Sequence, residues 1–465
     1  MIMKERFGMR HAVTACIAIF AVAMFAGCAT TPMVKDTAEK YYPPPPEQPR
    51  IKFVDYYSDL WHVGKKGQTW AESMFGKTEE RLFRKPYGIA VSPDGNRIYV
   101  TDAQNMMAFD LGKGEFINFS DSTGTGPGAL TYPFGIAMSR NNRLYVTDIT
   151  RKRVIVYDLD GKYQSVIGTD NQLLNPTAVA LDNERNLVYV VDSKAHNVKV
   201  YTLEGKLQRT IGGKTASFDD GSFNFPSNIM VSPDGEVYVV DSGNFRVQVF
   251  GPEGEFRRKW GRVGDMPGEF ARPRGIAMDS EGHIYIVDAA FQNVQVFTKE
   301  GRTLMWFGLG GPELGNFRLP AGIAIDASDR IFTVEQVRPR VQIFQFLGGK
   351  YFETNKKELA DLERRLGKTF AFKEIVEPPP PAAAAPVSPE ADKAAVAGEQ
   401  KPETKPEERK PLSPQADLLV KMIEVKYGKL SDEHRARIEK ADPDTLLKWG
   451  VRVFSAEKIE HVFGE

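Results

Sequence analysis

The chain has 465 residues and a formal net charge of zero, with 61 Lys and Arg residues against 61 Asp and Glu residues. Hydrophobic residues make up 42% of the chain, which is enough for a large core or for more than one domain. The balanced charge excludes a strongly basic nucleic-acid module, and the two cysteines exclude a disulfide framework. We therefore expect no nucleic-acid partner.

The first 27 residues have the pattern of an export signal. Three basic residues precede a fourteen-residue apolar run at 12–25, which is too short to span a hydrocarbon core of roughly 30 Å comfortably. The run leads through Ala26 and Gly27 to Cys28. This ending resembles the bacterial lipobox, in which small residues precede a cysteine that is acylated and becomes the new N-terminus. The alternative is a plain secreted protein in which Cys28 is incidental.

The resemblance to a lipobox implies that Cys28 carries acyl chains that anchor the protein to a membrane. Cys16 lies inside the segment that would be removed, so the mature chain would keep a single cysteine. The Pro-rich residues 28–50 are expected to form a stiff tether between the membrane and the body. The residue after the cysteine is Ala29 and not an Asp. In some bacteria the absence of this Asp allows sorting to the outer membrane, so we expect an envelope lipoprotein of the outer rather than the inner membrane.

A sixfold repeat dominates the body of the chain, at 51–350. Each unit begins at a proline that recurs every 43 to 50 residues, and its second apolar run ends at an acid. The prolines are Pro86, Pro133, Pro176, Pro226, Pro273 and Pro320, and the acids are Asp102, Asp148, Asp192, Asp241, Asp288 and Glu335.

Short β-strands account for the pattern inside one unit. In the fifth unit, strands are expected at 275–278, 283–287, 294–297 and 302–307, with turn residues between them. Four strands in about 47 residues are typical of one propeller blade, and radial repetition protects the sheet edges. The sequence therefore predicts an all-β, six-bladed β-propeller. The repeat resembles that of NHL-repeat propellers, most closely at 226–260 and 273–307.

The sixth unit lacks its own fourth strand. After 341–344 the chain soon becomes charged and helical in pattern, so the outer strand has to come from another segment. The segment 50–57 has the required pattern and would close the ring with N-terminal sequence. The alternative is that 350–353 supplies the strand locally.

Helical and disordered segments are expected after the propeller. The leucine spacing at 353–372, within a flanking region 351–375, predicts a helix packed on the propeller exterior. Residues 376–414 are rich in Pro, Ala, Glu and Lys and are predicted to be a disordered linker. N-cap residues such as Ser431 and amphipathic runs predict a separate helical module at 415–465. Residues 426–463 resemble a helical domain of unknown function on bacterial transposase-like nuclease proteins, without the catalytic residues of a nuclease.

The histidines and the strand-end acids of the propeller could either bind a metal ion or have a purely structural role. Related six-bladed propellers use a central metal to act on amides or lactones, but only His62, His196 and His283 lie in or near the propeller, without ligand spacing. The six strand-end acids occur in every unit, so we expect them to cap turns through hydrogen bonds to backbone N–H groups. We therefore assign no catalytic, metal-binding or cofactor-binding residue and expect no cofactor.

Clusters of basic residues distinguish some units from others. They lie at 151–153, 257–259 and 338–340 and could meet an anionic glycan or lipid headgroup, although such runs are usually solvated faces. The preferred hypothesis is a membrane-anchored, non-enzymatic binding or assembly scaffold for protein or glycan partners. The alternatives are a metal-dependent, lactonase-like hydrolase or lyase in the central channel, and a C-terminal module that acts while the propeller is a spacer.

Overall fold

The structure is a computed structural model of the chain. It describes residues 39–58, residues 82–370 except 104, 118 and 170, and, near the C-terminus, residues 419–420, 423, 430–442, 445–446, 449 and 459–463. The predicted export signal, Cys28 and the predicted linker lie outside these residues. The chain divides into two compact units, Met1–Val376 and Glu377–Glu465. Within the described residues, no helix is both long and apolar enough to cross a membrane.

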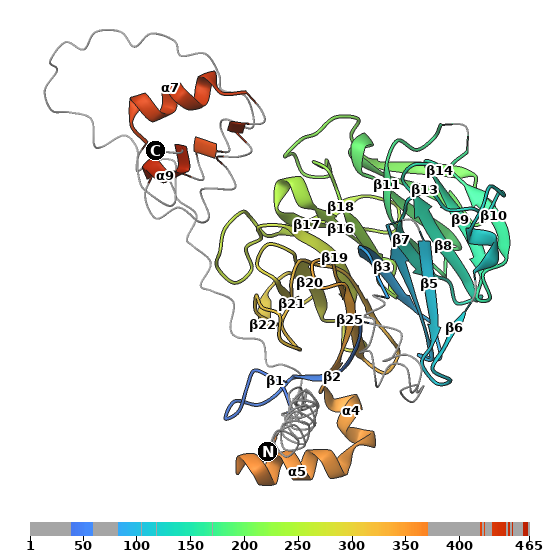
Figure 1. Cartoon of the computed structure of the whole chain (residues 1–465), viewed down its shortest axis with the longest axis vertical. Helices are drawn as coiled ribbons and strands as arrows, with labels where there is room; N and C mark the ends of the chain where they lie inside the picture. The colour runs from blue at the N-terminus through green and yellow to red at the C-terminus, as the bar shows by residue number, and fades with distance from the viewer. Residues whose placement is uncertain are drawn as a thin grey trace, which may run out of the picture. The chain divides into compact units, whose positions relative to one another are not determined.

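Six antiparallel sheets follow one another along the first unit, as the sixfold repeat predicts (Figure 1). The first three blades are β3 (Pro86–Val91), β4 (Arg97–Asp102), β5 (Asn105–Asp110) and β6 (Glu115–Ile117); β7 (Pro133–Met138), β8 (Arg143–Asp148), β9 (Arg153–Asp158) and β10 (Tyr163–Ile167); and β11 (Pro176–Asp182), β12 (Leu187–Asp192), β13 (Asn197–Thr202) and β14 (Leu207–Gly212).

The last three sheets continue the same order. They are β15 (Asn228–Val231), β16 (Val237–Asp241), β17 (Arg246–Phe250) and β18 (Phe256–Trp260); β19 (Pro273–Met278), β20 (Ile284–Asp288), β21 (Asn293–Phe297) and β22 (Thr303–Phe307); and β23 (Pro320–Ile325), β24 (Arg330–Glu335) and β25 (Arg340–Phe346), joined by β2 (Ile51–Tyr57) and β1 (Tyr41–Tyr42).

The N-terminal segment closes the ring. Strand β2 pairs antiparallel with β25, with Ile51 opposite Phe346 and Tyr57 opposite Val341, and Figure 1 shows the blue β2 beside the brown β25. The prediction that residues 50–57 supply the missing outer strand is confirmed. The local alternative is wrong, because residues 349–354 form helix α4 instead.

Hydrophobic residues between neighbouring blades form the core. One cluster joins Ile89 and Phe109 of the first blade to Phe332 and Val341 of the sixth, and five further clusters join the other neighbouring pairs. A buried aromatic residue lies three positions before the acid that ends each second strand. These residues are Tyr99, Tyr145, Tyr189, Tyr238, Tyr285 and Phe332.

The glycine that follows Pro-x at the start of four inner strands permits close contact between blades. A Cβ atom on Gly88 would lie 2.6 Å from the carbonyl oxygen of Phe134, and one on Gly322 would lie 2.3 Å from that of Tyr87. Because these neighbours are backbone atoms, a larger residue would push adjacent blades apart. The third and fourth blades have Ala178 and Asn228 at this position.

Two helices follow the last blade where one was expected. Helix α4 (Gly349–Thr354) and helix α5 (Lys356–Leu366) meet at Asn355, whose side-chain amide donates to the carbonyl oxygen of Tyr351 at 2.8 Å. A side chain that bonds its local backbone competes with the helix and explains the break. The helices bury Phe352 and Leu362 against the body, so the predicted exterior packing is confirmed.

The second unit has a small hydrophobic cluster and two short described helices, α7 (Asp432–Lys440) and α9 (Ile459–Phe463). The side-chain oxygen of Ser431 accepts a hydrogen bond from the backbone N–H of His434, which confirms the predicted N-cap. Buried residues of this cluster include Ile423, Ile438 and Val462, all from the predicted amphipathic runs.

Candidate functional site

Turns and interblade connections meet at one end of the blades, which we call the connection face. The register places the proline of each inner strand opposite or beside the acid that ends the second strand, for example Pro133 opposite Asp148. The turns between second and third strands therefore lie at the same end as the connections that enter the inner strands. Loops held by a rigid sheet are common positions for binding residues.

The six strand-end acids fix these connections. In the third blade, the Asp192 carboxylate accepts hydrogen bonds from the backbone N–H groups of Leu174 and Asn175, each at 2.8 Å. The predicted capping role is confirmed, and the capped groups lie mainly 16 to 18 residues upstream, in the interblade connection. The acids with such bonds are Asp102, Asp148, Asp192, Asp241, Asp288 and Glu335.

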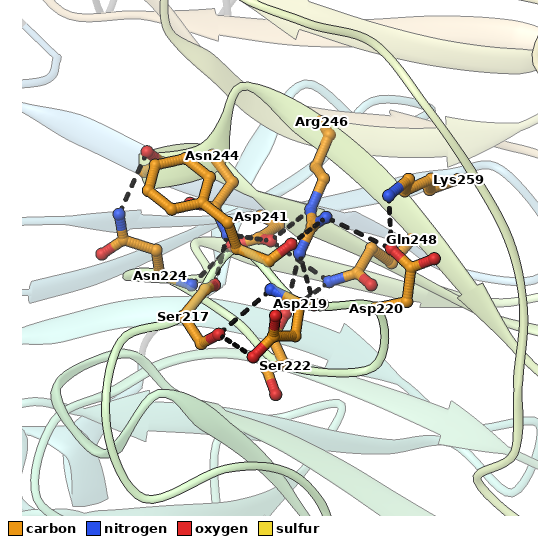
Figure 2. Close-up of polar contacts among 12 residues, drawn as sticks. Ser217, Asp219, Asp220, Ser222, Asn224, Asp241, Asn244, Arg246, Gln248 and Lys259 are labelled. Carbon is orange, nitrogen blue, oxygen red and sulfur yellow. Dashed lines mark hydrogen bonds and ion pairs between the residues drawn. The ribbon is translucent and has the colours of Figure 1, made fainter. Parts of the chain in front are cut away.

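A buried arginine extends this capping in the fourth blade. The Nε of Arg246 donates to Asp241 Oδ2 at 2.8 Å, and its terminal nitrogens donate to the carbonyl oxygens of Phe218, Asp219 and Ser222 at 2.9–3.0 Å. Figure 2 shows this guanidinium between the acid and the loop. The Arg246 and Asp241 side chains are only 7% and 0% exposed. A buried ion pair therefore fixes the loop at 213–225.

The sixth blade repeats the arrangement with other residues. Arg340 pairs with Glu335 and donates to the carbonyl oxygens of Pro312, Glu313 and Asn316 in the loop at 308–319. Burial raises the pKa of Glu335, as it does for Asp241. The sequence alone marks both acids and the basic run that contains Arg340, but the contacts of Arg246 and Arg340 to loops more than twenty residues away are visible only in the structure.

Exposed apolar side chains are concentrated on the connection face. Phe218 is 73% exposed and Leu309 is 62% exposed, and each lies on a loop that a buried arginine holds. Of the ten large hydrophobic residues that are exposed in the described part of the chain, seven lie on this face. The seven are Leu174, Phe218, Phe225, Val263, Met266, Leu309 and Val337.

The residues around the axis at this face break the repeat symmetry. Each blade contributes the residue before and the residue after the proline of its inner strand. None of these twelve residues is acidic, three are basic and four are aromatic. In blade order the pairs are Lys85 and Tyr87, Tyr132 and Phe134, Asn175 and Thr177, Phe225 and Ser227, Arg272 and Arg274, and Leu319 and Ala321. We call this ring the axial mouth.

Arg274 reaches across the axial mouth. Its guanidinium carbon lies 5.8 Å from the ring centroid of Tyr87, although the sixth blade separates the two blades that carry them. The small Ala321 occupies the intervening position on the sixth blade. Arg274 also donates to Gln336 Oε1 at 3.0 Å, and the Gln336 amide donates to the carbonyl oxygen of Pro86. Burial lowers the pKa of Arg274 and raises that of Tyr87.

An axial cavity of about 400 Å³ lies below the mouth, and the inner strands of all six blades line it. Aliphatic residues such as Ile89, Ile136 and Ile276 line it together with the Asn228 amide, and polar atoms form more of its exposed lining than apolar atoms do. Its volume lies within the range of small-molecule sites.

A second hollow of about 460 Å³ lies between the second and third blades, near the opposite ends of their strands. Polar side chains dominate it, including Arg143, Gln164 and Asn183. Burial raises the pKa of Tyr145 at its base.

The histidines do not meet in the structure. His196 follows the second strand of its blade on the connection face, and its Nδ1 accepts from the backbone N–H of Phe225 at 3.1 Å. His283 directly precedes β20 at the other end of its blade, and its Nδ1 lies 2.8 Å from Asp279 Oδ2. His62 lies outside the described residues. Within those residues, no group of three or more His, Cys, Asp or Glu side chains could hold a metal ion.

Acidic partners occupy much of the basic clusters. Glu236 accepts from both terminal nitrogens of Arg258 at 2.6 and 2.7 Å and from Arg257 at 3.1 Å, while Lys259 pairs with Asp220. Arg340 is buried against Glu335, and Arg338 donates to the carbonyl oxygen of Pro312. Arg151 donates to Thr131 and to the carbonyl oxygen of Gly126 on the connection face.

The Glu236 cluster predicts a pH-dependent contribution to stability. Its hydrogen bonds from Arg258 lower the pKa of Glu236 from 4.5 to about 2. We expect Glu236→Gln to lower the free energy of unfolding by about 2–3 kcal/mol at pH 7. Because the folded-state pKa is lowered, this stabilisation is present above pH 4.5 and is lost as the pH falls to about 2.

Urea unfolding between pH 2 and pH 7 measures this difference between the two proteins. The matched control is Glu255→Gln, since Glu255 also pairs with Arg257 but its side chain is 52% exposed. We expect the control to change stability much less, because water screens an exposed ion pair. A difference for Glu236→Gln that stays constant down to pH 2 would contradict the assignment.

Comparison with known proteins agrees on the fold. A protein-family model described as a 6-bladed β-propeller matches residues 77–211 and 218–297. No curated protein matches the chain. The chain is a six-bladed β-propeller protein with short helices near its C-terminus.

Solved structures with the same kind of fold include three that differ in their described roles. Virginiamycin B lyase from Staphylococcus aureus is 15% identical, covers 57% of this chain and 96% of its own, and gives a TM-score of 0.41. A protein of unknown function from Bacteroides thetaiotaomicron VPI-5482 is 20% identical over 57% and 70%, with a TM-score of 0.44. A chain of a nidogen–laminin complex is 21% identical over 53% and 89%, with a TM-score of 0.42. Likenesses of this size say nothing about what this chain binds or catalyses.

Proposed function

We propose that this protein is a membrane-anchored lipoprotein of the cell envelope whose propeller, of the NHL type, is a non-enzymatic scaffold that binds a partner protein on the connection face. The observation that carries the proposal is the concentration of exposed apolar side chains on this face, seven of ten in the described residues. Apolar side chains that gather into a patch on one face commonly mark a protein-binding surface, whereas single exposed apolar side chains are ordinary.

The way in which the apolar side chains are held supports a preformed binding surface. Phe218 and Leu309 lie on loops whose carbonyl oxygens accept hydrogen bonds from Arg246 and Arg340. Fixing the loops before binding reduces the entropy that association would otherwise cost. A protein partner fits this surface better than a glycan, for which the polar hollow between the second and third blades would be the natural position.

The proposed anchor is the acylated Cys28, and the outer membrane is the proposed membrane. The lipobox-like residues before Cys28 support acylation, and two or three acyl chains are sufficient for stable anchoring. The tether enters the fold at β1 and β2, the strands that complete the sixth blade. The fold would therefore be attached to the membrane at the strand pair that closes the ring.

Copurification from cells that produce the full chain tests the binding surface. We expect the double variant Phe218→Asp with Leu309→Asp to retain at least tenfold less partner than the unchanged protein, because charged groups cannot desolvate in an apolar interface. The matched control is Trp306→Asp, since Trp306 is 49% exposed but lies on the outer strand β22.

Two results would overturn the proposal. One is that the same proteins copurify equally with the double variant and with the unchanged chain, while Trp306→Asp loses them. The other is that the specifically retained material is a polysaccharide that survives protease treatment, which would favour a glycan partner.

A further inference from the structure

The axial mouth carries a cation without an acidic partner. Arg274 is held by one hydrogen bond to Gln336 and by the ring of Tyr87. Among the described residues, its guanidinium forms no ion pair, and four of the five N–H donors of an arginine remain for a ligand. The fully buried arginines of this propeller, by contrast, are paired: Arg246 pairs with Asp241 and Arg340 with Glu335.

We propose that the axial mouth binds a ligand that carries both a carboxylate or phosphate group and an aromatic ring. Arg274 would bind the anionic group, and the ring would stack near Tyr87 and Phe134. The site goes beyond the protein-docking proposal, because a free small molecule or a group on a partner could fill it.

The charge around the mouth favours an anion. Arg272 lies two residues before Arg274, at the start of the same inner strand, and Lys85 lies on the rim of the first blade. The nearest strand-end acid is Asp288, whose two oxygens accept hydrogen bonds from the backbone N–H groups of Ala271, Arg272, Ala290 and Phe291. Asp288 therefore stabilises its connection, and the guanidinium of Arg274 stays available.

Arg274 is half-buried, and this partial loss of water increases its effect on a ligand. Removing an arginine from water without a counter-charge is unfavourable, so an anion that supplies the charge and accepts hydrogen bonds is strongly favoured. The planar guanidinium can donate two parallel hydrogen bonds to a carboxylate or phosphate. A lysine at this position would supply the charge without that geometry.

The opposite wall of the mouth favours a planar apolar group. The rings of Tyr87 and Phe134 have centroids 3.5 Å apart at 31°, and Tyr132 lies 6.4 Å from Phe134 at 23°. Tyr87 also lines the axial cavity below the mouth. An anion with an aromatic ring would place its charge on Arg274 and its ring against this wall.

Calorimetric titration of the purified full chain with four small probes tests the inference. Benzoate and phenyl phosphate carry both an anion and a ring, acetate carries the anion alone, and benzamide is the neutral analogue of benzoate. We expect at least one ring-bearing anion to bind with one site per chain, and acetate and benzamide to bind at least tenfold more weakly. A comparison of the affinities of benzoate and phenyl phosphate shows whether the site prefers a carboxylate or a phosphate group.

Variants and a stability measurement complete the test. Arg274→Gln is expected to weaken the best anion at least tenfold, whereas Arg262→Gln, a change at an arginine that is 80% exposed and pairs with Glu269, is expected to leave binding unchanged. The unfolding temperature of the unchanged chain should rise when the anion is added and should not rise with benzamide. This measurement tests the inference without any variant.

The inference is overturned if neither ring-bearing anion binds, if benzamide binds as tightly, or if Arg274→Gln folds and binds equally well. These results leave the protein-docking proposal unaffected, because its test uses Phe218 and Leu309 on the outer loops. Loss of partner binding with anion binding intact would reject only the docking proposal.

Discussion

Replacing Asp241 with alanine is expected to lower the free energy of unfolding by about 3–5 kcal/mol. The Asp241 side chain is fully buried and accepts hydrogen bonds from Asn224, Asn244, Arg246 and Gln248. Its removal leaves the Arg246 guanidinium buried without a counter-charge. Urea unfolding of the full chain, followed by tryptophan fluorescence, measures the change.

Asp220 provides a matched control in the same network, visible in Figure 2. Its carboxylate pairs with Lys259 and lies 3.7 Å from Arg246, but the side chain is 49% exposed. We expect Asp220→Ala to cost less than about 1 kcal/mol. A double change, Asp241→Leu with Arg246→Met, should be less destabilised than Asp241→Ala because no buried charge is left unpaired. Equal losses for Asp241→Ala and Asp220→Ala would contradict the account.

Cys28→Ser is expected to abolish lipid attachment completely. The proposed acylation takes place on the Cys28 thiol, and serine offers no thiol to the acylating enzyme. Metabolic labelling with a fatty acid, followed by purification of the full chain, measures the effect. The unchanged chain should carry the label and should have lost residues 1–27.

The other cysteine of the chain is the control for this experiment. Cys16 lies in the segment that is proposed to be removed, so Cys16→Ser should be labelled and processed as the unchanged chain is. A labelled Cys28→Ser variant, or an unlabelled parent chain, would show that Cys28 is not the attachment site.

The six-bladed architecture could be predicted from the sequence because the residues that recur in each unit have the same structural role in each blade. A proline at the start of each inner strand and an acid at the end of each second strand recur at nearly constant spacing, and each acid has the same capping role in the structure. The closing strand at 51–57 was also predictable, since an open edge on the sixth blade needs a partner. The break at Asn355 was missed because leucine spacing describes a helix face and not its interruption.

The candidate sites were much less predictable. The residue after each repeat proline varies from Tyr87 to Arg274 to Ala321, and this variation is visible in the sequence. Its meaning depends on the side chain of Arg274 crossing the sixth blade to reach Tyr87, which no spacing rule gives. The sequence suggests the basic run at 257–259 as a possible anion site, but in the structure Glu236 pairs with Arg257 and Arg258, and Asp220 pairs with Lys259.

The two parts of the connection face have different physical roles in this account. The sheets and their acid caps form a rigid frame, and Arg246 and Arg340 fix the loops that present Phe218 and Leu309. The axial mouth lies inside this ring of loops and combines the charge of Arg274 with the aromatic rings of Tyr87 and Phe134. A partner that covers the loops and places an anionic group in the mouth would contact both the apolar loops and the axial mouth.

Site-specific photocrosslinking in the cells that produce the protein tests the central claim most directly. A photoreactive amino acid is placed at Phe218, at Leu309 or, as the control, at Trp306 on the outer strand β22. The account predicts that positions 218 and 309 give adducts with one and the same protein and that position 306 does not. Adducts from position 306 alone, with none from the connection face, would contradict it.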